Sequence, residues 1–270
     1  MSAAQLQLGM SSAATITAIA LQSGSAGNCI YIETETTALL IDAGISATLL
    51  RERLAEHGRD PSRISAILIS HDHGDHVRHV GVVQRKLKVP VYITEGSLGA
   101  ARRRFALGAM GDIQCFRPGA QLRVGSLTIE TVPTPHDGTQ GVAFVVGHRG
   151  RRLGVLTDLG HCFDGLGEVI GGLNGVFLES NYDPAMLREG GYPAHLKRRI
   201  QGPRGHLSNL EAAELIARHA GAGLRWACLS HLSGQNNDPT LALRTHRSIL
   251  GNEIPLHVAP RDCSAQPLKV

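Results

Sequence analysis

One short segment, Ser70-His71-Asp72-His73-Gly74-Asp75-His76, limits the possible folds of this chain more than any other part of its sequence. The apolar run 66–69 directly before it is typical of a buried strand, and the pattern of 75–87 after it predicts a helix. We therefore expect the segment on a loop at the carboxyl end of a strand, a place where protein loops commonly carry functional sites.

The residue types in this segment suit a metal site. His71 and His73 are two residues apart in an extended loop and can approach one ion, whereas Asp75 and His76 point elsewhere and can serve a second. Imidazole and carboxylate groups suit Zn²⁺, Mn²⁺ or Fe²⁺. The alternative is a polar loop that is rich in histidine by chance, since the chain has 14 histidines among 270 residues. The spacing H-x-H-x-D-H favours the metal site over that alternative.

Short strand-like and helical stretches alternate along the rest of the chain. Strands are predicted at 15–21, 29–32, 38–41, 66–69, 121–124, 127–132, 142–146, 152–156, 176–178, 224–229 and 256–258. Helices are predicted at 46–57, 75–87, 95–105, 183–201, 208–219 and 239–250. With no repeat and no long linker, we expect one α/β domain over 15–270, with sheets packed face to face and helices outside. Residues 1–14 are expected to form a disordered tail.

Composition limits the protein class further. The net charge of +4 is mild, so it permits a phosphate-bearing partner without requiring one. No apolar run reaches the roughly 18 residues of a membrane span, and the first 14 residues lack the features of a signal peptide. The 5 cysteines are scattered, without a C-x-x-C pair, which favours a reducing, cytoplasmic location.

At these residues the chain resembles the metallo-β-lactamase-fold hydrolases, whose signature is H-x-H-x-D-H. That family adds four residues, each after a strand, and this sequence supplies them in order: Asp42 in LLIDAG, His136 in PTPHDG, Asp158 in LTDLG and His231 in LSHLS. Taken singly, His136 could be a surface histidine and His231 a core histidine, but the ordered set favours the family. The resemblance implies an αββα sandwich of two mixed sheets.

The resemblance also implies a role for each residue. His71, His73 and His136 would hold one divalent ion, and Asp75, His76 and His231 would hold another. Asp158 would bridge the two ions, and Asp42 would orient the ligand loop by hydrogen bonds. The ions would be Zn²⁺ or Mn²⁺, with Fe²⁺ as a further possibility, and Asp42 and Asp75 would count among the catalytic residues.

Two further segments are candidates for binding an anion. In Ser23-Gly24-Ser25-Ala26-Gly27-Asn28 the glycines let backbone N–H groups approach an anion, which makes Ser23, Ser25 and Asn28 candidate phosphate contacts; the alternative is a plain glycine-rich turn. Ser208 and Glu211 form a predicted capping box, so a helix begins there and its N-terminus attracts anions. His206 lies two residues earlier and would bind a phosphate or protonate a leaving group, unless it is only a surface residue beside a helix cap.

A third group of candidates lies between residues 179 and 204. Asn181 follows a strand-like run, and Lys197, Arg198 and Arg199 are consecutive on a predicted helix. Three adjacent basic residues are usually a solvated surface, yet here they lie within ten residues of the His206 segment, with Arg204 between them. This proximity favours contacts with nucleic-acid phosphates.

The segments SGSAGN, LESNYD, YPAHLKRRI and GHLSN resemble the WalJ/YycJ subgroup of the family, which is associated with exonuclease-like action on DNA. A looser resemblance is to the PhnP type, which hydrolyses cyclic phosphodiesters. Only about 70 residues separate Asp158 from His231, too few for the inserted domain of the β-CASP nucleases. The absence of a flexible arm argues against the tRNA-processing enzymes, and an aspartate at the bridging position argues against a typical antibiotic-degrading lactamase.

We therefore expect a dinuclear metal-dependent hydrolase of phosphodiester bonds, a nuclease acting on DNA rather than RNA. The alternatives are a small cyclic phosphodiesterase, a thioester or lactone hydrolase of the same fold, and a metal-stabilised regulatory protein that is not an enzyme. The partner would be nucleic acid or a small phosphodiester, without a membrane. The sequence leaves open the native metal, the choice between DNA, RNA and a small cyclic phosphate as substrate, the direction of cleavage and the oligomeric state.

Overall fold

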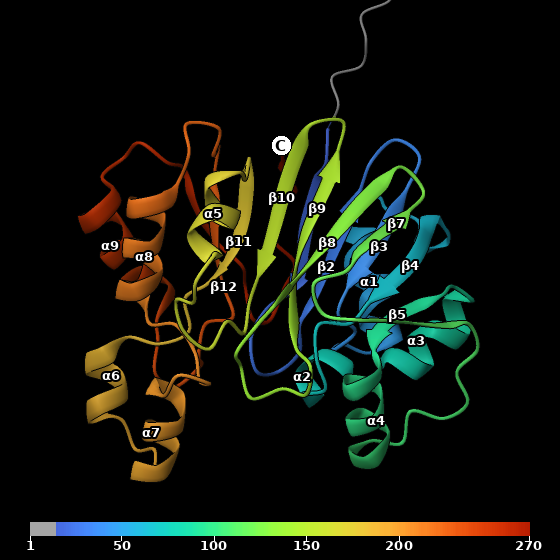
Figure 1. Cartoon of the computed structure of the whole chain (residues 1–270), viewed down its shortest axis with the longest axis horizontal. Coiled ribbons are helices and arrows are strands. Elements are labelled where there is room, and N and C mark those ends of the chain that lie inside the picture. Colours follow the sequence, from blue (N-terminus) through green and yellow to red (C-terminus); the bar gives the residue numbers. More distant parts are fainter. Residues whose placement is uncertain (1–14) are drawn as a thin grey trace, which may run out of the picture.

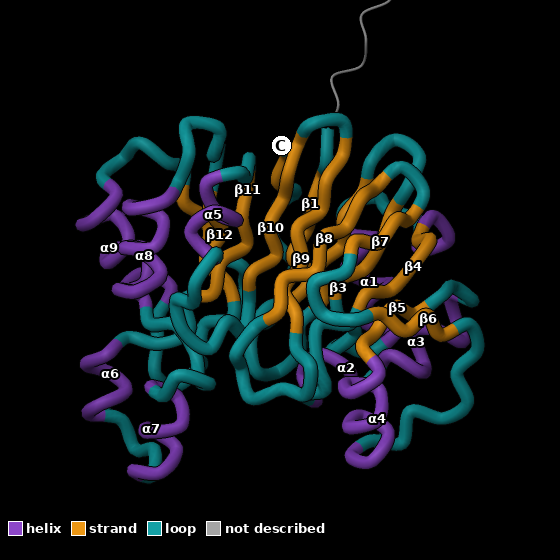
Figure 2. Tube along the Cα trace, viewed as in Figure 1, coloured by secondary structure: helices purple, strands orange, loops and turns teal. Residues whose placement is uncertain are grey.

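Two seven-stranded sheets pack face to face, and helices lie on both outer sides (Figures 1 and 2). The computed structural model describes residues 15–270, so the prediction of a disordered tail at 1–14 lies outside the described residues. The predicted α/β architecture of two mixed sheets with helices outside is confirmed. The expectation of a single domain over 15–270 stays a prediction.

The first sheet has the strand order β14-β1-β2-β3-β4-β5-β6. Its strands are β1 (Thr17–Gln22), β2 (Cys29–Glu33), β3 (Ala38–Ile41), β4 (Ile64–Leu68), β5 (Val91–Thr94), β6 (Ile113–Phe116) and β14 (Leu268–Lys269). Strands β3 to β6 are parallel to one another, and β1 pairs antiparallel with β2 and β14.

The second sheet has the order β13-β12-β11-β10-β9-β8-β7. Its strands are β7 (Gln121–Val124), β8 (Leu127–Pro133), β9 (Val142–His148), β10 (Arg151–Leu156), β11 (Gly175–Glu179), β12 (Ala227–Ser230) and β13 (Leu256–Val258). Strands β10 to β13 are parallel, and β7 to β10 are antiparallel. In both sheets, therefore, several parallel strands end at the same edge, and their loops meet there.

Helices close the outer faces of both sheets. They are α1 (Ala47–Glu56), α2 (Gly74–Val77), α3 (Val80–Leu87), α4 (Glu95–Arg104), α5 (Leu166–Gly171), α6 (Pro184–Glu189), α7 (Ala194–Gln201), α8 (Asn209–His219) and α9 (Pro239–Leu250), with a 3-10 turn at Pro61–Arg63. Helices α1, α3 and α4 pack on the first sheet, and α5 and α8 pack on the second. Helices α6 and α7 extend beyond the strands at the lower left of Figure 1.

Strand β3 shows why the central strands are apolar throughout. Leu39 and Ile41 belong to the core between the sheets, whereas Leu40 belongs to the core beneath the helices. Because side chains alternate between the two faces of a strand, a strand buried on both faces carries apolar residues at every position.

Several predicted boundaries were wrong. The predicted helix 183–201 is two helices, because Gly190, Gly191 and Pro193 fall between α6 and α7 and a proline cannot continue a helix from within. The predicted helix 75–87 is likewise split into α2 and α3. Strands β5, β6 and β14 and helix α5 were not predicted. β6 lies at a sheet edge with mostly exposed or half-exposed residues, so it lacks an apolar pattern. β14 has only two residues, and β5 has four that lead directly into α4. None of the described helices is long and apolar enough to span a membrane.

Candidate metal centre

The histidines and aspartates predicted as ligands meet at one edge of the two sheets. Asp42 follows β3 and the His71–His76 segment follows β4, so these residues come from neighbouring parallel strands of the first sheet. His136, Asp158 and His231 come from loops of the second sheet, after β8, β10 and β12. The site therefore lies where the carboxyl ends of strands from both sheets meet.

His71, His73 and His136 form the first group of possible ligands, with one ring nitrogen of each within 4.8 Å of the others. His136 Nε2 lies 3.3 Å from His73 Nδ1. The opposite nitrogens are engaged by the protein, since His136 Nδ1 donates to the carbonyl oxygen of Gly205 at 2.7 Å and His71 Nδ1 lies 3.0 Å from Ser70 Oγ. His71 Nε2 is buried and has no hydrogen-bond partner, as expected of a nitrogen reserved for a metal ion.

Asp75, His76 and His231 form the second group. Asp75 Oδ2 lies 3.3 Å from His231 Nε2 and 3.4 Å from His76 Nε2. The other nitrogen of His76 donates to Asp42 Oδ2 at 2.7 Å, and Asp42 Oδ1 accepts the backbone N–H of Ser70 at 2.8 Å. Asp42 thus holds both the ring of His76 and the start of the loop, which directs His76 Nε2 toward the other two residues.

Asp158 lies between the two groups. Its Oδ2 is 3.2 Å from His76 Nε2 and its Oδ1 is 3.7 Å from His136 Nε2, so one carboxylate reaches a member of each group. The side chain is buried, and Oδ2 makes no hydrogen bond. A buried carboxylate oxygen without a donor is costly unless a cation compensates it.

The backbone is strained at three of these positions. Asp42, Asp158 and His231 have φ values of 64°, 54° and 56°, and they are three of the seven described residues other than glycine with positive φ. Such a conformation costs on the order of 1–3 kcal/mol per residue and collects at functional sites. Here it turns the chain sharply after β3, β10 and β12, so that each side chain enters the shared site.

The charges of the cluster favour a cation. Burial lowers the pKa of His71 well below 6.5, so its imidazole is neutral and able to coordinate. Burial also opposes charge on Asp158, but the neighbouring His231 and His76 outweigh it and hold the pKa of this carboxyl well below its usual range. Burial likewise opposes protonation of His231, yet Asp158 and Asp75 raise its pKa to about 9. The carboxylates of the cluster thus favour positive charge beside them.

His206 lies beside both groups and is held by a residue that we did not single out from the sequence. Its Nδ1 donates to Glu179 Oε1 at 2.6 Å, and Glu179 is fully buried at the end of β11, with Oε2 accepting the N–H of Leu159 at 2.8 Å. The His206 ring lies 4.8 Å from the ring of His136. An acidic residue that ends an apolar strand, as in VFLE, was the available signal for Glu179.

The predicted phosphate residues of the first loop differ in exposure. Ser25 is exposed, but Ser23 and Asn28 are buried. Ser23 Oγ accepts the N–H of His231 at 2.8 Å, and Asn28 Nδ2 donates to Asp75 Oδ2 at 3.1 Å. Asn28 Nδ2 also lies 3.0 Å from His76 Nε2, so the side chains of Ser23 and Asn28 contact the second group of possible ligands directly.

Asn181 and Ser208 are also buried and bonded within the protein. Asn181 Nδ2 donates to the carbonyl oxygen of His231 at 2.9 Å. Ser208 caps α8, and its side chain and that of Glu211 form the predicted capping box. Asn181 thus positions a possible ligand, and Ser208 fixes the start of α8 immediately after His206.

The basic residues of α7 have different environments. Lys197 Nζ donates to the carbonyl oxygen of Arg188 at 2.7 Å, and Arg199 Nε donates to Asp137 Oδ2 at 2.6 Å. Arg198 is exposed and has no ion pair or hydrogen bond with another described residue. Only Arg198 of the three is therefore free of partners within the described part of the protein.

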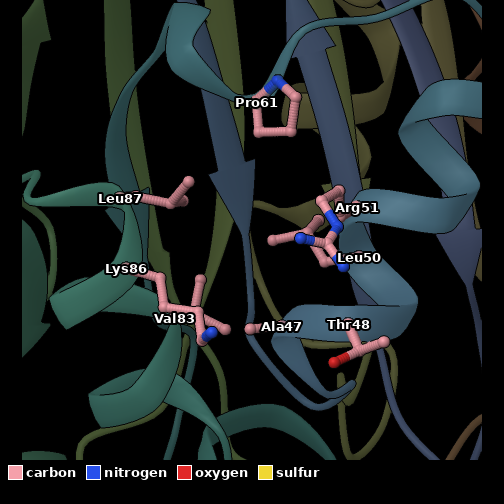
Figure 3. Close-up of a pocket in the computed structure, with 8 residues that line it drawn as sticks. All are labelled: Ala47, Thr48, Leu50, Arg51, Pro61, Val83, Lys86 and Leu87. Atoms are coloured by element: carbon pink, nitrogen blue, oxygen red, sulfur yellow. The ribbon is translucent and has the colours of Figure 1, made fainter.

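A cavity of about 320 Å³ lies elsewhere, between α1, α3 and the 3-10 turn (Figure 3). It is lined by Ala47, Thr48, Leu50, Arg51, Pro61, Val83, Lys86 and Leu87. None of these residues belongs to the clusters of possible metal ligands, so the cavity is separate from the candidate metal centre.

Comparisons with known proteins agree with this arrangement. A family model described as the β-lactamase superfamily domain matches residues 37–232. The crystal structure of the metallo-β-lactamase-fold protein YhfI from Bacillus subtilis superposes with a TM-score of 0.72 over 95% of this chain and 100% of that chain, at 17% sequence identity. The chain therefore belongs to the β-lactamase superfamily and is a hydrolase with the metallo-β-lactamase fold.

Two curated relatives are more similar in sequence. Exodeoxyribonuclease WalJ from Streptococcus pneumoniae serotype 2 is 36% identical over 227 residues, which covers 83% of this chain and 84% of the relative. Exodeoxyribonuclease YycJ from Bacillus anthracis is 32% identical over 238 residues, covering 85% and 87%. The resemblance to the WalJ/YycJ subgroup, based on motifs, is confirmed over most of the chain.

Proposed function

We propose that this protein is a dinuclear metal-dependent phosphodiesterase that acts as an exonuclease on DNA. The observation that carries the proposal is the position of Asp158 between two groups of ligand residues, with the His206–Glu179 pair beside them. The naming of both curated relatives as exodeoxyribonucleases supports DNA as the substrate.

The residues of the cluster fit two divalent ions, Zn²⁺ or Mn²⁺, because nitrogen and carboxylate oxygen donors converge and two buried donor atoms have no other partner. His71, His73 and His136 would hold one ion, Asp75, His76 and His231 the other, and Asp158 both. Two such ions supply a water molecule of lowered pKa and offset negative charge on the phosphoryl oxygens. Asp42, Asn28 and Asn181 contact these residues and fix their orientation.

His206 is the proposed general acid. Because Glu179 accepts the N–H at Nδ1, the other ring nitrogen, Nε2, carries the proton that moves to the leaving oxygen. After this transfer the ring is neutral and still donates from Nδ1 to Glu179. The carboxylate of Glu179 thereby fixes the tautomer and stabilises the charged ring before transfer.

Phosphate binding completes the proposal. Ser25 and Ala26 are the exposed residues of the loop 23–28, and Arg198 is an exposed cation on α7. We assign the DNA backbone contacts to these groups, with Lys197 near them and the start of α8 at Ser208 adding a favourable dipole.

The test is His206→Ala measured on two substrates. We expect turnover of a natural DNA diester, whose leaving group is a poor one, to fall by about 10²–10⁴-fold, the range of a positioned acid. Turnover of bis(p-nitrophenyl) phosphate should fall much less, because p-nitrophenolate leaves without a proton. Metal content should be unchanged, since His206 is not among the proposed ligands.

Glu179→Gln is the companion variant, since it keeps the shape of the side chain but not its charge. Like His206→Ala, it should lower turnover of the DNA diester more than turnover of bis(p-nitrophenyl) phosphate, but by a smaller factor. Equal losses on both substrates would instead indicate phosphate binding by His206. Wild-type turnover of both substrates by His206→Ala would rule out a catalytic role, and turnover of thioesters or lactones but not of diesters would favour the alternative hydrolase.

A further inference from the structure

Helix α7 contacts the first group of possible ligands through Asp137, a residue that follows His136 directly. Arg199 Nε, on α7, donates to Asp137 Oδ2 at 2.6 Å. The other oxygen of Asp137 lies 3.2 Å from His73 Nε2 and 3.4 Å from His136 Nε2. A chain of contacts therefore runs from Arg199 through Asp137 to His73.

The two nitrogens of His73 face different neighbours. Nδ1 faces His136 Nε2, 3.3 Å away, on the side where the first group converges. Nε2 faces Asp137 Oδ1 instead. If Asp137 accepts the N–H at Nε2, the lone pair is left on Nδ1, the nitrogen that faces the ion. A carboxylate acting on the outer nitrogen of a histidine ligand in this way fixes its tautomer and its ring orientation.

Asp137 is itself held firmly. Its backbone N–H donates to the carbonyl oxygen of Arg204 at 3.1 Å, so both its backbone and its side chain are fixed by the segment that follows α7 or by α7 itself. Asp137 Oδ1 is buried and makes no hydrogen bond within the described part of the chain, which leaves it available to His73.

We propose that Asp137 and Arg199 form a positioning pair that orients His73 for the ion held by the first group. Arg199 then acts through Asp137 and is not a free contact for DNA phosphates, unlike its neighbour Arg198. The pair also connects the basic helix α7 to the metal centre. This inference rests on the proposed function, because it requires that His73 holds an ion.

The experiment measures metal affinity and not activity. Metal-free protein is titrated with Zn²⁺ in competition with a chromophoric chelator, which resolves the affinities of two equivalents. In Asp137→Ala we expect one equivalent to weaken by about 10–100-fold, the usual effect of removing such a partner of a ligand, and the other to keep its affinity. Asp137→Asn retains an acceptor oxygen and should recover most of the loss.

A double-mutant cycle tests whether the two residues act together. Arg199→Gln should weaken the same equivalent, and Asp137→Ala/Arg199→Gln should lose no more than Asp137→Ala alone, because Arg199 acts only through Asp137. The matched control is Glu130→Gln, which breaks a comparable surface ion pair with Arg152 at 3.0 Å and should leave both affinities unchanged. Arg198→Gln separates loss of charge on α7 from loss of the pair, and it too should leave both affinities unchanged.

Three results would overturn the inference. The first is wild-type affinity for both equivalents in Asp137→Ala, and the second is an additive loss in the double variant. The third is an equal loss of Zn²⁺ affinity in Arg198→Gln, which would show that the loss comes from a smaller positive charge on α7 and not from the Asp137–Arg199 pair. Failure of the wild-type protein to bind two equivalents would overturn the proposed function itself, and this inference with it.

Discussion

His246, on α9, should make the protein sensitive to acid even though it lies outside the metal centre. It is fully buried, and its Nε2 lies 3.1 Å from Ser180 Oγ, which itself donates to Asn209 Oδ1 at 2.6 Å. Because Ser180 donates its hydroxyl proton to Asn209 Oδ1, Ser180 Oγ accepts a hydrogen bond from His246. The proton of the neutral His246 ring is therefore on Nε2. Nδ1 is buried without a partner, so a second proton would place a charge and an unsatisfied donor in the core.

The size of the effect follows from the pKa of His246, which burial lowers from 6.5 to about 4. Between these values the unfolded chain binds more protons than the folded one, so stability rises with pH and falls on acidification. With these two pKa values, the free energy of unfolding at pH 5 is about 2 kcal/mol lower than at pH 7.5, and below pH 4 the loss approaches about 3.4 kcal/mol.

Chemical denaturation of the metal-free protein at pH 7.5 and pH 5.0 measures this loss. His246→Gln does not titrate, so its free energy of unfolding should fall by about 2 kcal/mol less than that of the wild type between the two pH values. Other groups titrate in both proteins and cancel in the comparison. The reasoning would be refuted if the two proteins lost the same stability within about 0.5 kcal/mol, the error expected for comparing such variants.

Three further predictions concern the metal centre and the substrate. Asp158→Ala should bind fewer than two metal equivalents, because a methyl group cannot replace a carboxylate that reaches both groups; two full equivalents by metal analysis would contradict the bridging role. Gly138→Ala should weaken metal binding, since an added Cβ would lie 2.7 Å from the His71 ring; an unchanged affinity would show that the ring can move without cost. DNA affinity should fall steeply between 50 and 200 mM salt, with a log–log slope of about −0.7 to −0.9 for each phosphate contact, and Arg198→Gln should make the slope shallower by about one contact.

The sequence predicted most of the strands that are buried on both faces, but it missed β5, whose side chains also pack against a core on either side. β3 and the run 66–69, which includes the end of β4, are continuously apolar because each packs against a core on either side, and such runs are visible without a structure. β6 could not be predicted, because at the sheet edge it is held by pairing with β5 and not by an apolar face. The pattern of apolar residues along a short stretch of sequence indicates burial, but it does not indicate pairing with a strand that is distant in sequence.

The same distinction applies to the site. The candidate ligands of the His71–His76 segment were predicted from residue type and spacing. The family resemblance supplied His136, Asp158 and His231 as further candidates, and Asp42 as an orienting residue. Two other contacts around the site were missed, because Asp137 and Glu179 bond to residues more than 25 positions away, Arg199 and His206. Ser23 and Asn28 were predicted for phosphate, yet their side chains contact His231 and Asp75. Sequence shows that a polar residue is present but not which partner its side chain reaches.

The origin of the ligands has a consequence for folding as well as for catalysis. The first group combines His71 and His73 from the first sheet with His136 from the second, and the second group joins Asp75 and His76 to His231 in the same way. Each ion would therefore connect the two sheets at the edge where strained residues already turn the chain. Since an ion that binds only the folded state stabilises it, by about 2.7 kcal/mol at 100 times its Kd, two ions would offset much of the strain at Asp42, Asp158 and His231.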